Sequence, residues 1–409
     1  MIGDGRSDYV FFNPSLVNAE NSSVSNMDNF SAIISVRRDR VESTWQSWYG
    51  QSFILNRWNT QVVIGSTFQI ISPIKYIAIS NSVVIDINQF VPCMPPPVCN
   101  ANGTLVVKVT SGPEDPRIFS YEGAKYISFF SYDNIIGANY SYGISTYDEN
   151  YVGYYGTGTN LCIPTPDGLI GRMYVSKIYP SPPNECMLQQ LVPIYQDGFH
   201  FTNNSIIKNW LAFSLDSELY FIHQISPQFI VTKISVMTET EWVATLHSSV
   251  TTPSSIIALD SYNSVDKDES SGKSAITSNI HGSVNPVLIN SEISSWNTSY
   301  FLSIFHVLSN DPSSSYAAYA FAFCPYYSFN ITALSNRLPL NLTGYSSYRC
   351  GGKFPFAFVS GIEIFPCEAN SSEACLVISY GVCDQESRVS VMKLVDFETN
   401  MMTLFPSSY

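Results

Sequence analysis

The stretch from Gly112 to Phe129, GPEDPRIFSYEGAKYISF, carries the strongest local structural signal in the chain. The acidic pair Glu114 and Asp115 lies between two prolines, and a run of β-forming residues follows it. A Glu-Gly turn separates that run from a second one, so the stretch predicts a β-hairpin that begins at a proline-bounded turn. Because the residue before a proline is biased away from helical geometry, we expect Pro116 to hold Asp115 in extended backbone.

Arg117 is close enough in sequence to Asp115 to pair with its carboxylate or with a substrate anion. Two interpretations of this tetrapeptide are open. In one, Asp115 is a functional carboxylate whose direction is fixed by the turn. In the other, the turn is closed by a structural salt bridge.

Similar β-forming runs recur along the whole chain, with turn residues between them. Amphipathic helical periodicity is nearly absent. The spacing of the runs predicts an all-β fold of about 20 strands. The main expected strands are 61–71, 83–87, 104–109, 125–132, 171–178, 219–225, 229–237, 300–307, 316–323, 356–364, 374–380 and 389–394.

A single barrel of about 20 strands would be hollow, whereas four-stranded blades repeated around an axis bury their faces. We therefore predict one five-bladed β-propeller domain over residues 1–409, although no WD or kelch repeat is present. Residues 251–285 are rich in Ser, carry interspersed charges and lack periodicity. We expect this segment to be an exposed insertion.

The composition excludes several classes of protein. Apolar residues make up 45% of the chain and charged residues only 13%, unlike a disordered protein. The 20 Lys and Arg are scattered and outnumbered by 33 Asp and Glu, so no nucleic-acid partner is expected. No apolar run reaches the ~18 residues of a membrane helix, so no membrane span is predicted.

The nine cysteines indicate disulfides. None belongs to a CxxC pair, which argues against a zinc ribbon or a thioredoxin-like site. The segments Cys93–Cys99 and Cys367–Cys375 have the composition of loops closed by disulfides, and buried free thiols are the alternative. The odd number leaves one thiol free or paired with another chain. The residues expected in disulfides are Cys93, Cys99, Cys162, Cys186, Cys324, Cys350, Cys367 and Cys375.

Nine Asn-X-Ser/Thr sequons favour an extracellular glycoprotein. The chain begins Met1-Ile2-Gly3-Asp4-Gly5-Arg6, without the apolar region of a signal peptide. Taking the sequons and cysteines together, we infer a secreted or extracellular protein whose signal peptide is absent from this sequence. The expected glycosylation sites are Asn21, Asn29, Asn102, Asn139, Asn203, Asn297, Asn330, Asn341 and Asn370.

Other short motifs line up with the Glu-Asp-Pro-Arg turn in a fixed order. The ordered set resembles the five-bladed β-propeller family of carbohydrate-active enzymes, which includes β-1,2-mannoside phosphorylases and hydrolases and related glycosyltransferase-like proteins. The resemblance spans about residues 10 to 395. The motifs around the turn are Phe12-Asn13-Pro14-Ser15-Leu16, Ser35-Val36-Arg37-Arg38, Lys208-Asn209-Trp210-Leu211-Ala212-Phe213, Phe305-His306-Val307, Arg349-Cys350-Gly351-Gly352 and Ile378-Ser379-Tyr380-Gly381-Val382-Cys383-Asp384.

The resemblance implies that a carbohydrate binds in the central funnel of the propeller. It implies that Asp115 is the general acid and that Arg117 is a polar contact at the same site. Trp210 could stack on a sugar face, and the alternative is a Trp buried between blades. No cofactor is expected. The other residues that would line the funnel are Lys208, Asn209, His306, Arg349 and Asp384.

The Arg349 loop departs from the family pattern. Where the family has Arg-Gly-Gly-Thr-Pro, this chain has Arg349-Cys350-Gly351-Gly352-Lys353-Phe354-Pro355, and the cysteine suggests a stapled loop. The phosphorylases of the family bind phosphate through arginines with a Lys or His. Because basic residues are few here, we expect hydrolysis, transfer or no chemistry in preference to phosphorolysis.

The histidines carry weaker signals. His306 ends an aromatic strand, where a hydrogen-bonded structural histidine is the alternative to a site residue. His200 and His223 are not spaced as zinc ligands, so no metal site is predicted. No Gly-X-Ser-X-Gly elbow, phosphate-binding loop or dinucleotide fingerprint is present.

Two functions stay open. The first is a glycoside hydrolase or glycosyltransferase that uses Asp115 as acid, a role that calls for a raised carboxyl pKa through partial burial. The second is a non-catalytic extracellular propeller that binds glycans or belongs to a surface assembly, with copies of itself or with other surface proteins.

Overall fold

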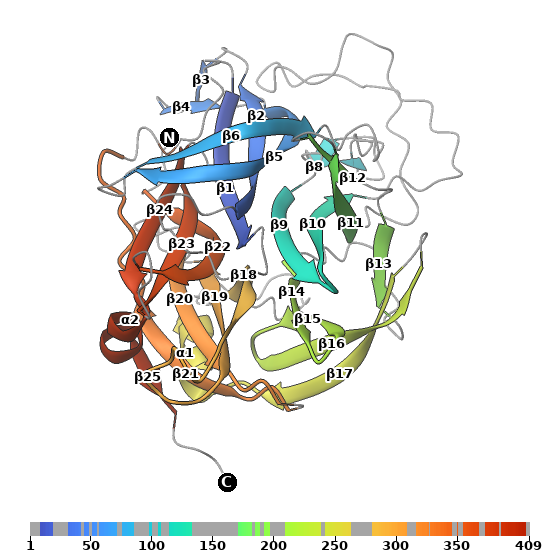
Figure 1. Cartoon of the computed structure of the whole chain (residues 1–409). Coiled ribbons are helices and arrows are strands. Elements are labelled where there is room, and N and C mark those ends of the chain that lie inside the picture. Colours follow the sequence, from blue (N-terminus) through green and yellow to red (C-terminus); the bar gives the residue numbers. More distant parts are fainter. Residues whose placement is uncertain are drawn as a thin grey trace.

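The structure is a computed structural model, and it is mostly β in the residues that it describes (Figure 1). The all-β class expected from the sequence is therefore confirmed. The number of blades stays a prediction. The described residues are 9–18, 32–41, 45–48, 51–54, 57–71, 76–85, 98–99, 105–107, 114–132, 171–181, 185–188, 192–196, 209–238, 242–262, 280–308, 316–326, 328–345, 350, 355–367, 373–383 and 386–405.

The N-terminal part forms a four-stranded antiparallel sheet in the order β1-β2-β5-β6. Two small hairpins, β3–β4 and β7–β8, lie outside this sheet. The strand bounds are β1 (Tyr9–Asn18), β2 (Ala32–Val41), β3 (Trp45–Trp48), β4 (Gln51–Ile54), β5 (Arg57–Ile71), β6 (Tyr76–Ile85), β7 (Val98–Cys99) and β8 (Leu105–Val107).

The middle of the chain forms a nine-stranded sheet made of two antiparallel meanders. One meander contains β9 to β13 and the other contains β14 to β17, and the parallel pair β13–β17 joins them. The bounds are β9 (Glu114–Tyr121), β10 (Ala124–Tyr132), β11 (Gly171–Ser181), β12 (Glu185–Leu188), β13 (Val192–Gln196), β14 (Leu211–Leu215), β15 (Glu218–Gln224), β16 (Gln228–Met237) and β17 (Trp242–Thr251).

The C-terminal part contains a five-stranded and a three-stranded antiparallel sheet. The final strand, β25, returns to pair with β21 instead of extending the last sheet. The bounds are β18 (Ile280–Ile289), β19 (Tyr300–Leu308), β20 (Tyr316–Phe323), β21 (Ile331–Arg337) and β25 (Met402–Leu404) in the first sheet, and β22 (Ala357–Pro366), β23 (Ala374–Val382) and β24 (Glu386–Lys393) in the second.

Two short helices are present in the described part of the chain, α1 (Ser254–Tyr262) and α2 (Leu394–Met401). At two turns each they are too short to show clear periodicity, which is why the sequence did not predict them. In α2 the buried Glu398 carboxylate accepts hydrogen bonds from Tyr300 Oη at 2.6 Å and Ser294 Oγ at 2.8 Å, and these fix the helix to the loop before β19. Neither α1 nor α2, the helices of the described residues, is long and apolar enough to cross a bilayer.

The first strands of the meanders gather around the middle of the molecule (Figure 1). Each contacts the next: β1 with β9, β9 with β14, β14 with β18, β18 with β22, and β22 with β1. The core lies between the sheets, where apolar side chains from neighbouring meanders pack face to face. In one such layer the ring of Phe213 lies 4.9 Å from Phe301 and 5.3 Å from Phe329, which ties β14 to the sheet that begins with β18.

The segment 251–285, expected to be an exposed insertion, is part of the fold at both ends. Ile256 of α1 is fully buried, and β18 begins at Ile280 and carries Ser283 and Val284 into the interior. The expected exposure therefore does not hold for these ends, and residues 263–279 lie outside the described residues. The Ser-rich composition misled because the Ser283 hydroxyl donates to the Val359 carbonyl instead of to water.

Gly282 lies where β18 approaches the chain just before β14. A Cβ added at this position would lie 2.8 Å from the Asn209 carbonyl oxygen and 2.9 Å from the Leu211 side chain. Atoms do not pack that closely, and the first of them belongs to the backbone. Glycine is therefore needed here for close approach of two inner strands.

We expect Gly282→Ala to lower the free energy of unfolding by about 1–3 kcal/mol, because the added methyl must push the two inner strands apart. Chemical denaturation of both proteins measures this loss. The matched control is Gly123→Asn, at a turn where the added Cβ meets nothing within 4 Å and where Asn tolerates the positive φ of 72°. Equal stability of Gly282→Ala and the control would contradict the close approach.

Candidate functional site

Asp115 lies at a β-bulge at the start of β9. In the β9–β10 ladder Arg117 faces Ser128 and Glu114 faces Phe130, so Asp115 and Pro116 together stand opposite a single residue. Pro116 has no N–H to give to the ladder, and a bulge is one of the few places where a strand accepts a proline. Bulges also redirect side chains, and here the redirected residue is Asp115.

The backbone of Asp115 differs from the sequence expectation. Its φ is +49°, in the left-handed region, instead of extended. The preference imposed by the following proline is overridden by the bulge and by the hydrogen bonds that hold it. Asp and Asn are the residues that adopt this region most readily after glycine. The Asp115 side chain is half-buried.

Arg117 has its guanidinium inside the protein, with 1% of the residue exposed. Its Nε donates to the Ser283 carbonyl at 2.8 Å and its Nη1 to the Asp115 carbonyl at 2.9 Å. Its Nη2 donates to Asn209 Oδ1 at 3.2 Å and to the Gly282 carbonyl at 3.4 Å. One buried cation therefore joins β9, β18 and the residue before β14.

Burial lowers the pKa of the Arg117 guanidinium, and the charge of Asp115 acts in the opposite direction. A buried cation is stable only where acceptors replace its water shell. Three carbonyls and an amide oxygen do so here, with Asp115 as the nearby countercharge. Arg117 was expected to contact substrate, but these hydrogen bonds direct its guanidinium to protein acceptors.

Asn209 is buried beside this guanidinium and also has a positive φ, at 66°. Asp115 and Asn209 both accept hydrogen bonds from the Arg117 guanidinium, and both adopt the left-handed conformation. Asp115 lies within β9, and Asn209 lies just before β14. Asn tolerates this region, and its side-chain oxygen accepts a hydrogen bond from Arg117 Nη2. The expected site residue Asn209 is therefore brought next to Asp115 and Arg117.

A second set of polar hydrogen bonds links the inner strands. Asn285 of β18 accepts from the Ala212 N–H at 2.8 Å and donates from Nδ2 to the Ile118 carbonyl at 3.1 Å. One side chain thereby links β18 to both β14 and β9. The Ser283 hydroxyl makes the corresponding link to Val359 of β22.

Sequence reasoning missed Gly282, Ser283 and Asn285, because all three were assigned to the insertion. One signal could have found them. A glycine between β-forming residues marks a point where another backbone approaches closely, and Gly282 stands between Ile280 and Val284.

Trp210 is part of the core. It is 1% exposed, and its ring lies 4.9 Å from His223 and 6.0 Å from Phe221. Of the two expectations for this residue, the structure has the buried Trp, which offers no open face to a sugar. Burial in this packing lowers the pKa of His223 to about 4.

His306 is also buried in aromatic packing. Its ring lies 4.8 Å from Phe358, 5.0 Å from Tyr316 and 5.6 Å from His281. It therefore lies between the β18–β25 sheet and the β22–β24 sheet, and its role as a site residue stays a prediction.

Lys208, Arg349 and Asp384 lie outside the described residues, so their place in the site stays a prediction. The chain neighbours of the last two, Cys350 and Cys383, form a disulfide with a Cα–Cα distance of 5.0 Å. It joins the chain before β22 to the end of β23.

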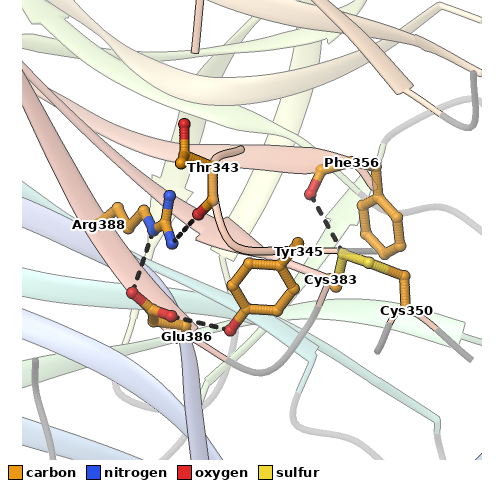
Figure 2. Close-up of a disulfide and its surroundings, with 7 residues drawn as sticks. All are labelled: Thr343, Tyr345, Cys350, Phe356, Cys383, Glu386 and Arg388. Atoms are coloured by element: carbon orange, nitrogen blue, oxygen red, sulfur yellow. Dashed lines mark hydrogen bonds and ion pairs between the residues drawn. A yellow bond between two sulfur atoms is a disulfide. The ribbon is translucent and has the colours of Figure 1, made fainter. Parts of the chain in front are cut away.

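A polar cluster lies beside this disulfide (Figure 2). Glu386 accepts from Tyr345 Oη at 2.8 Å and from Arg388 Nε at 3.0 Å, and Arg388 Nη2 donates to the Thr343 carbonyl at 3.0 Å. Burial would raise the pKa of the Glu386 carboxyl, but these hydrogen bonds and the Arg388 charge hold that pKa below its usual value. The cluster fixes the segment that precedes the Cys350 loop.

The cysteines follow the expectation in part. The Cys367–Cys375 disulfide is present, as expected. Cys350 is bonded to Cys383, which the sequence prediction left out. Cys324, expected in a disulfide, is a free thiol in the β20–β21 turn, and burial raises its pKa. The error arose because only folding brings Cys383 to Cys350, 33 residues away.

The pairing of the remaining expected cysteines stays a prediction. Cys93 and Cys162 lie outside the described residues, and Cys99 and Cys186 belong to β7 and β12.

Three of the nine sequons fall on described residues with exposed side chains, Asn297, Asn330 and Asn341. The others lie outside the described ranges, at Asn21, Asn29, Asn102, Asn139, Asn203 and Asn370. In the described part of the chain, no group of three or more His, Cys, Asp or Glu is placed to hold a metal ion. What the site offers chemically is the carboxyl group of the half-buried Asp115, next to the hydrogen-bonded network of Arg117.

No family model matches the chain, and no curated protein matches it by sequence. Among solved structures, a GDP-Man-dependent mannosyltransferase from Leishmania mexicana is similar over 99% of this chain and 90% of its own, with a TM-score of 0.42 and 11% identity. A mannose phosphorylase from Leishmania mexicana, solved with phosphate ion, covers 98% and 89%, with a TM-score of 0.41 and 12% identity.

A thermostable family-43 glycoside hydrolase covers 98% of this chain and 94% of its own, with a TM-score of 0.38 and 10% identity. All three TM-scores are below 0.5, so these structures carry no argument about function.

We expect the stability of the protein to fall as the pH decreases from 6.5 towards 4, in part through His223. In this window the unfolded chain takes up a proton at His223, whose ordinary pKa is 6.5, while the folded protein does not, because its pKa is about 4. Linkage then removes about 2 kcal/mol between pH 7 and pH 5. Urea unfolding at both pH values measures this change. His223→Gln should flatten it, and an unchanged slope in the variant would contradict the assignment.

We expect removal of the Cys350–Cys383 disulfide by paired alanine substitutions to lower the free energy of unfolding by about 2–4 kcal/mol. The matched control removes Cys367–Cys375, which closes 8 residues instead of 33. Because loop-closure entropy grows with loop length, the control should lose roughly 1 kcal/mol less. Guanidinium unfolding of the three proteins provides the comparison, and a larger loss in the control would contradict it.

Proposed function

We propose that this chain is a carbohydrate-active protein with a five-bladed β-propeller fold, in which Asp115 is the general acid at a glycosidic bond. The five blades would be those led by β1, β9, β14, β18 and β22. Support for them comes from the ring of contacts that these strands make with one another. The resemblance of the ordered motifs to β-1,2-mannoside-active enzymes supplies the substrate class.

One observation carries the assignment of Asp115. Its carboxyl group is half-buried on a bulge where the inner strands meet, and a buried guanidinium holds the backbone below it. A carboxyl group held in one direction within reach of the scissile bond is the geometry that general acid catalysis requires. Asp115 would protonate the departing glycosidic oxygen as the C–O bond breaks. The oxygen of a water molecule (hydrolysis) or of a sugar hydroxyl (transfer) would then bond to the anomeric carbon and lose its proton to solvent, and the Asp115 carboxylate would take up a proton again.

The burial of the Arg117 guanidinium among protein acceptors disfavours phosphorolysis. A phosphorylase needs cationic side chains that face the phosphate, whereas the described hydrogen bonds of Arg117 go to protein acceptors. We therefore place hydrolysis and transfer ahead of phosphorolysis. Lys208, Arg349 and Asp384 stay proposed contacts of the sugar.

The second candidate is a non-catalytic extracellular propeller that binds glycans or joins a surface assembly. It is favoured by the burial of Trp210 and His306, which removes two expected sugar contacts from the surface. A secreted setting, proposed for either function, is supported by two disulfides in the described residues and by exposed sequons such as Asn297.

We expect Asp115→Asn to lower kcat on β-1,2-mannobiose by roughly 100- to 10,000-fold, as the loss of a general acid does. The melting temperature should fall by only a few degrees, because the variant loses the countercharge of Arg117 but keeps its four hydrogen bonds to main-chain carbonyls and Asn209, and Asn accepts the positive φ of this position. Release of mannose, followed by NMR, measures the turnover.

The matched control is Glu114→Gln, which neutralises the adjacent carboxylate and should keep kcat within about threefold. Unchanged turnover in Asp115→Asn would remove the proposed role. Binding of β-1,2-mannobiose by the wild-type protein without turnover would favour the second candidate.

A further inference from the structure

The Nε and Nη2 atoms of the Arg117 guanidinium are held by acceptors other than Asp115. Its Nε and Nη2 donate to two successive carbonyls of β18, those of Ser283 at 2.8 Å and Gly282 at 3.4 Å. A guanidinium is a rigid planar fork, so two hydrogen bonds to one strand fix its orientation. Asn209 fixes Nη2 from a third direction, at 3.2 Å.

The remaining described hydrogen bond of the guanidinium leads to the bulge. Nη1 donates to the main-chain carbonyl of Asp115 at 2.9 Å. Pro116 restricts the backbone on the other side of that carbonyl. Together the two constraints hold Asp115 at a φ of +49°, a conformation that side-chain-bearing residues rarely adopt. Once this peptide is fixed, the direction of the Asp115 Cα–Cβ bond is fixed with it.

We propose that Arg117 is a positioning residue that aims the Asp115 carboxyl group through the bulge carbonyl, with Asn209 as its support. This inference rests on the proposed function, because it gives a role to Arg117 in the same site. Arg117 does not need to touch the sugar. It acts through Asp115, because its hydrogen bonds hold the Asp115 carbonyl of β9 in a fixed position relative to β18.

The test is Arg117→Lys, which keeps the positive charge but loses the fork. A small misplacement of a catalytic group can cost on the order of 100-fold in rate. We expect kcat on β-1,2-mannobiose to fall about 100-fold, with KM within about threefold of the wild-type value. A fall in kcat without a rise in KM distinguishes misorientation of the Asp115 carboxyl group from weaker sugar binding.

The matched control is Asn285→Ala. It removes two links between the same inner strands, to the Ala212 N–H and the Ile118 carbonyl, but it leaves the bulge untouched. If Arg117 served only to hold the strands together, both variants would lose kcat in proportion to their melting temperatures. An equal fall in kcat in Arg117→Lys and in Asn285→Ala would overturn the proposal.

Crystal structures of the two variants provide a readout that needs no turnover. We expect Asp115 to leave its left-handed conformation in Arg117→Lys and to keep it in Asn285→Ala. An unchanged Asp115 in Arg117→Lys would overturn the positioning role. If the wild-type protein does not turn over β-1,2-mannobiose, the proposed function fails by itself, and these structures alone decide whether Arg117 positions Asp115.

Asn209→Gly is the second variant, for the case that Arg117→Lys does not fold. Glycine keeps the positive φ of 66° at this position and removes only the amide that supports Nη2. We expect kcat to fall about tenfold and the φ of Asp115 to leave the left-handed region, as in Arg117→Lys. A wild-type rate together with an unshifted turn would overturn the role of this support.

Discussion

The buried charge of Arg117 is the constraint on which the centre of the molecule depends. A guanidinium that is 1% exposed must find acceptors from within the protein. It takes them from β18, from the bulge of β9 and from Asn209 before β14. Three inner strands that are far apart in sequence are thereby held in one relative position. Breaking such a buried set by removing one partner typically costs about 3–5 kcal/mol.

This constraint also sets the unusual backbone of Asp115, the residue to which the proposed function gives the acid role. The bulge and the positive φ would be unfavourable in an isolated hairpin, and the clamp on the Asp115 carbonyl makes them the stable form. A rigid backbone beneath one half-buried carboxyl group is a suitable base for acid catalysis. The aromatic and histidine candidates lie elsewhere: Trp210 and His306 serve the packing between sheets.

The sequence predicted local elements well where the signal was local. The hairpin after Asp115 follows from alternating β-formers and a Glu-Gly turn, and the structure has β9 and β10 there. The Cys367–Cys375 loop is equally local. The prediction was wrong where distant residues decide the outcome. Cys350 pairs with Cys383, which lies 33 residues away, and Cys324 is a free thiol. The Ser-rich composition predicted an insertion where β18 lies, but Ser283 of β18 donates to the Val359 carbonyl of β22.

By itself, the sequence determined that the protein is all-β, acidic and poor in charge, and that Asp115 is its most specific candidate residue. These properties depend on composition and on neighbours within a few positions. Only the tertiary structure decided that Arg117 points inward, that Asp115 is left-handed and not extended, and that Asn209 and Gly282 complete the centre. The reason is that a guanidinium can serve a substrate or the fold. Acceptors more than 90 residues away decide which it does.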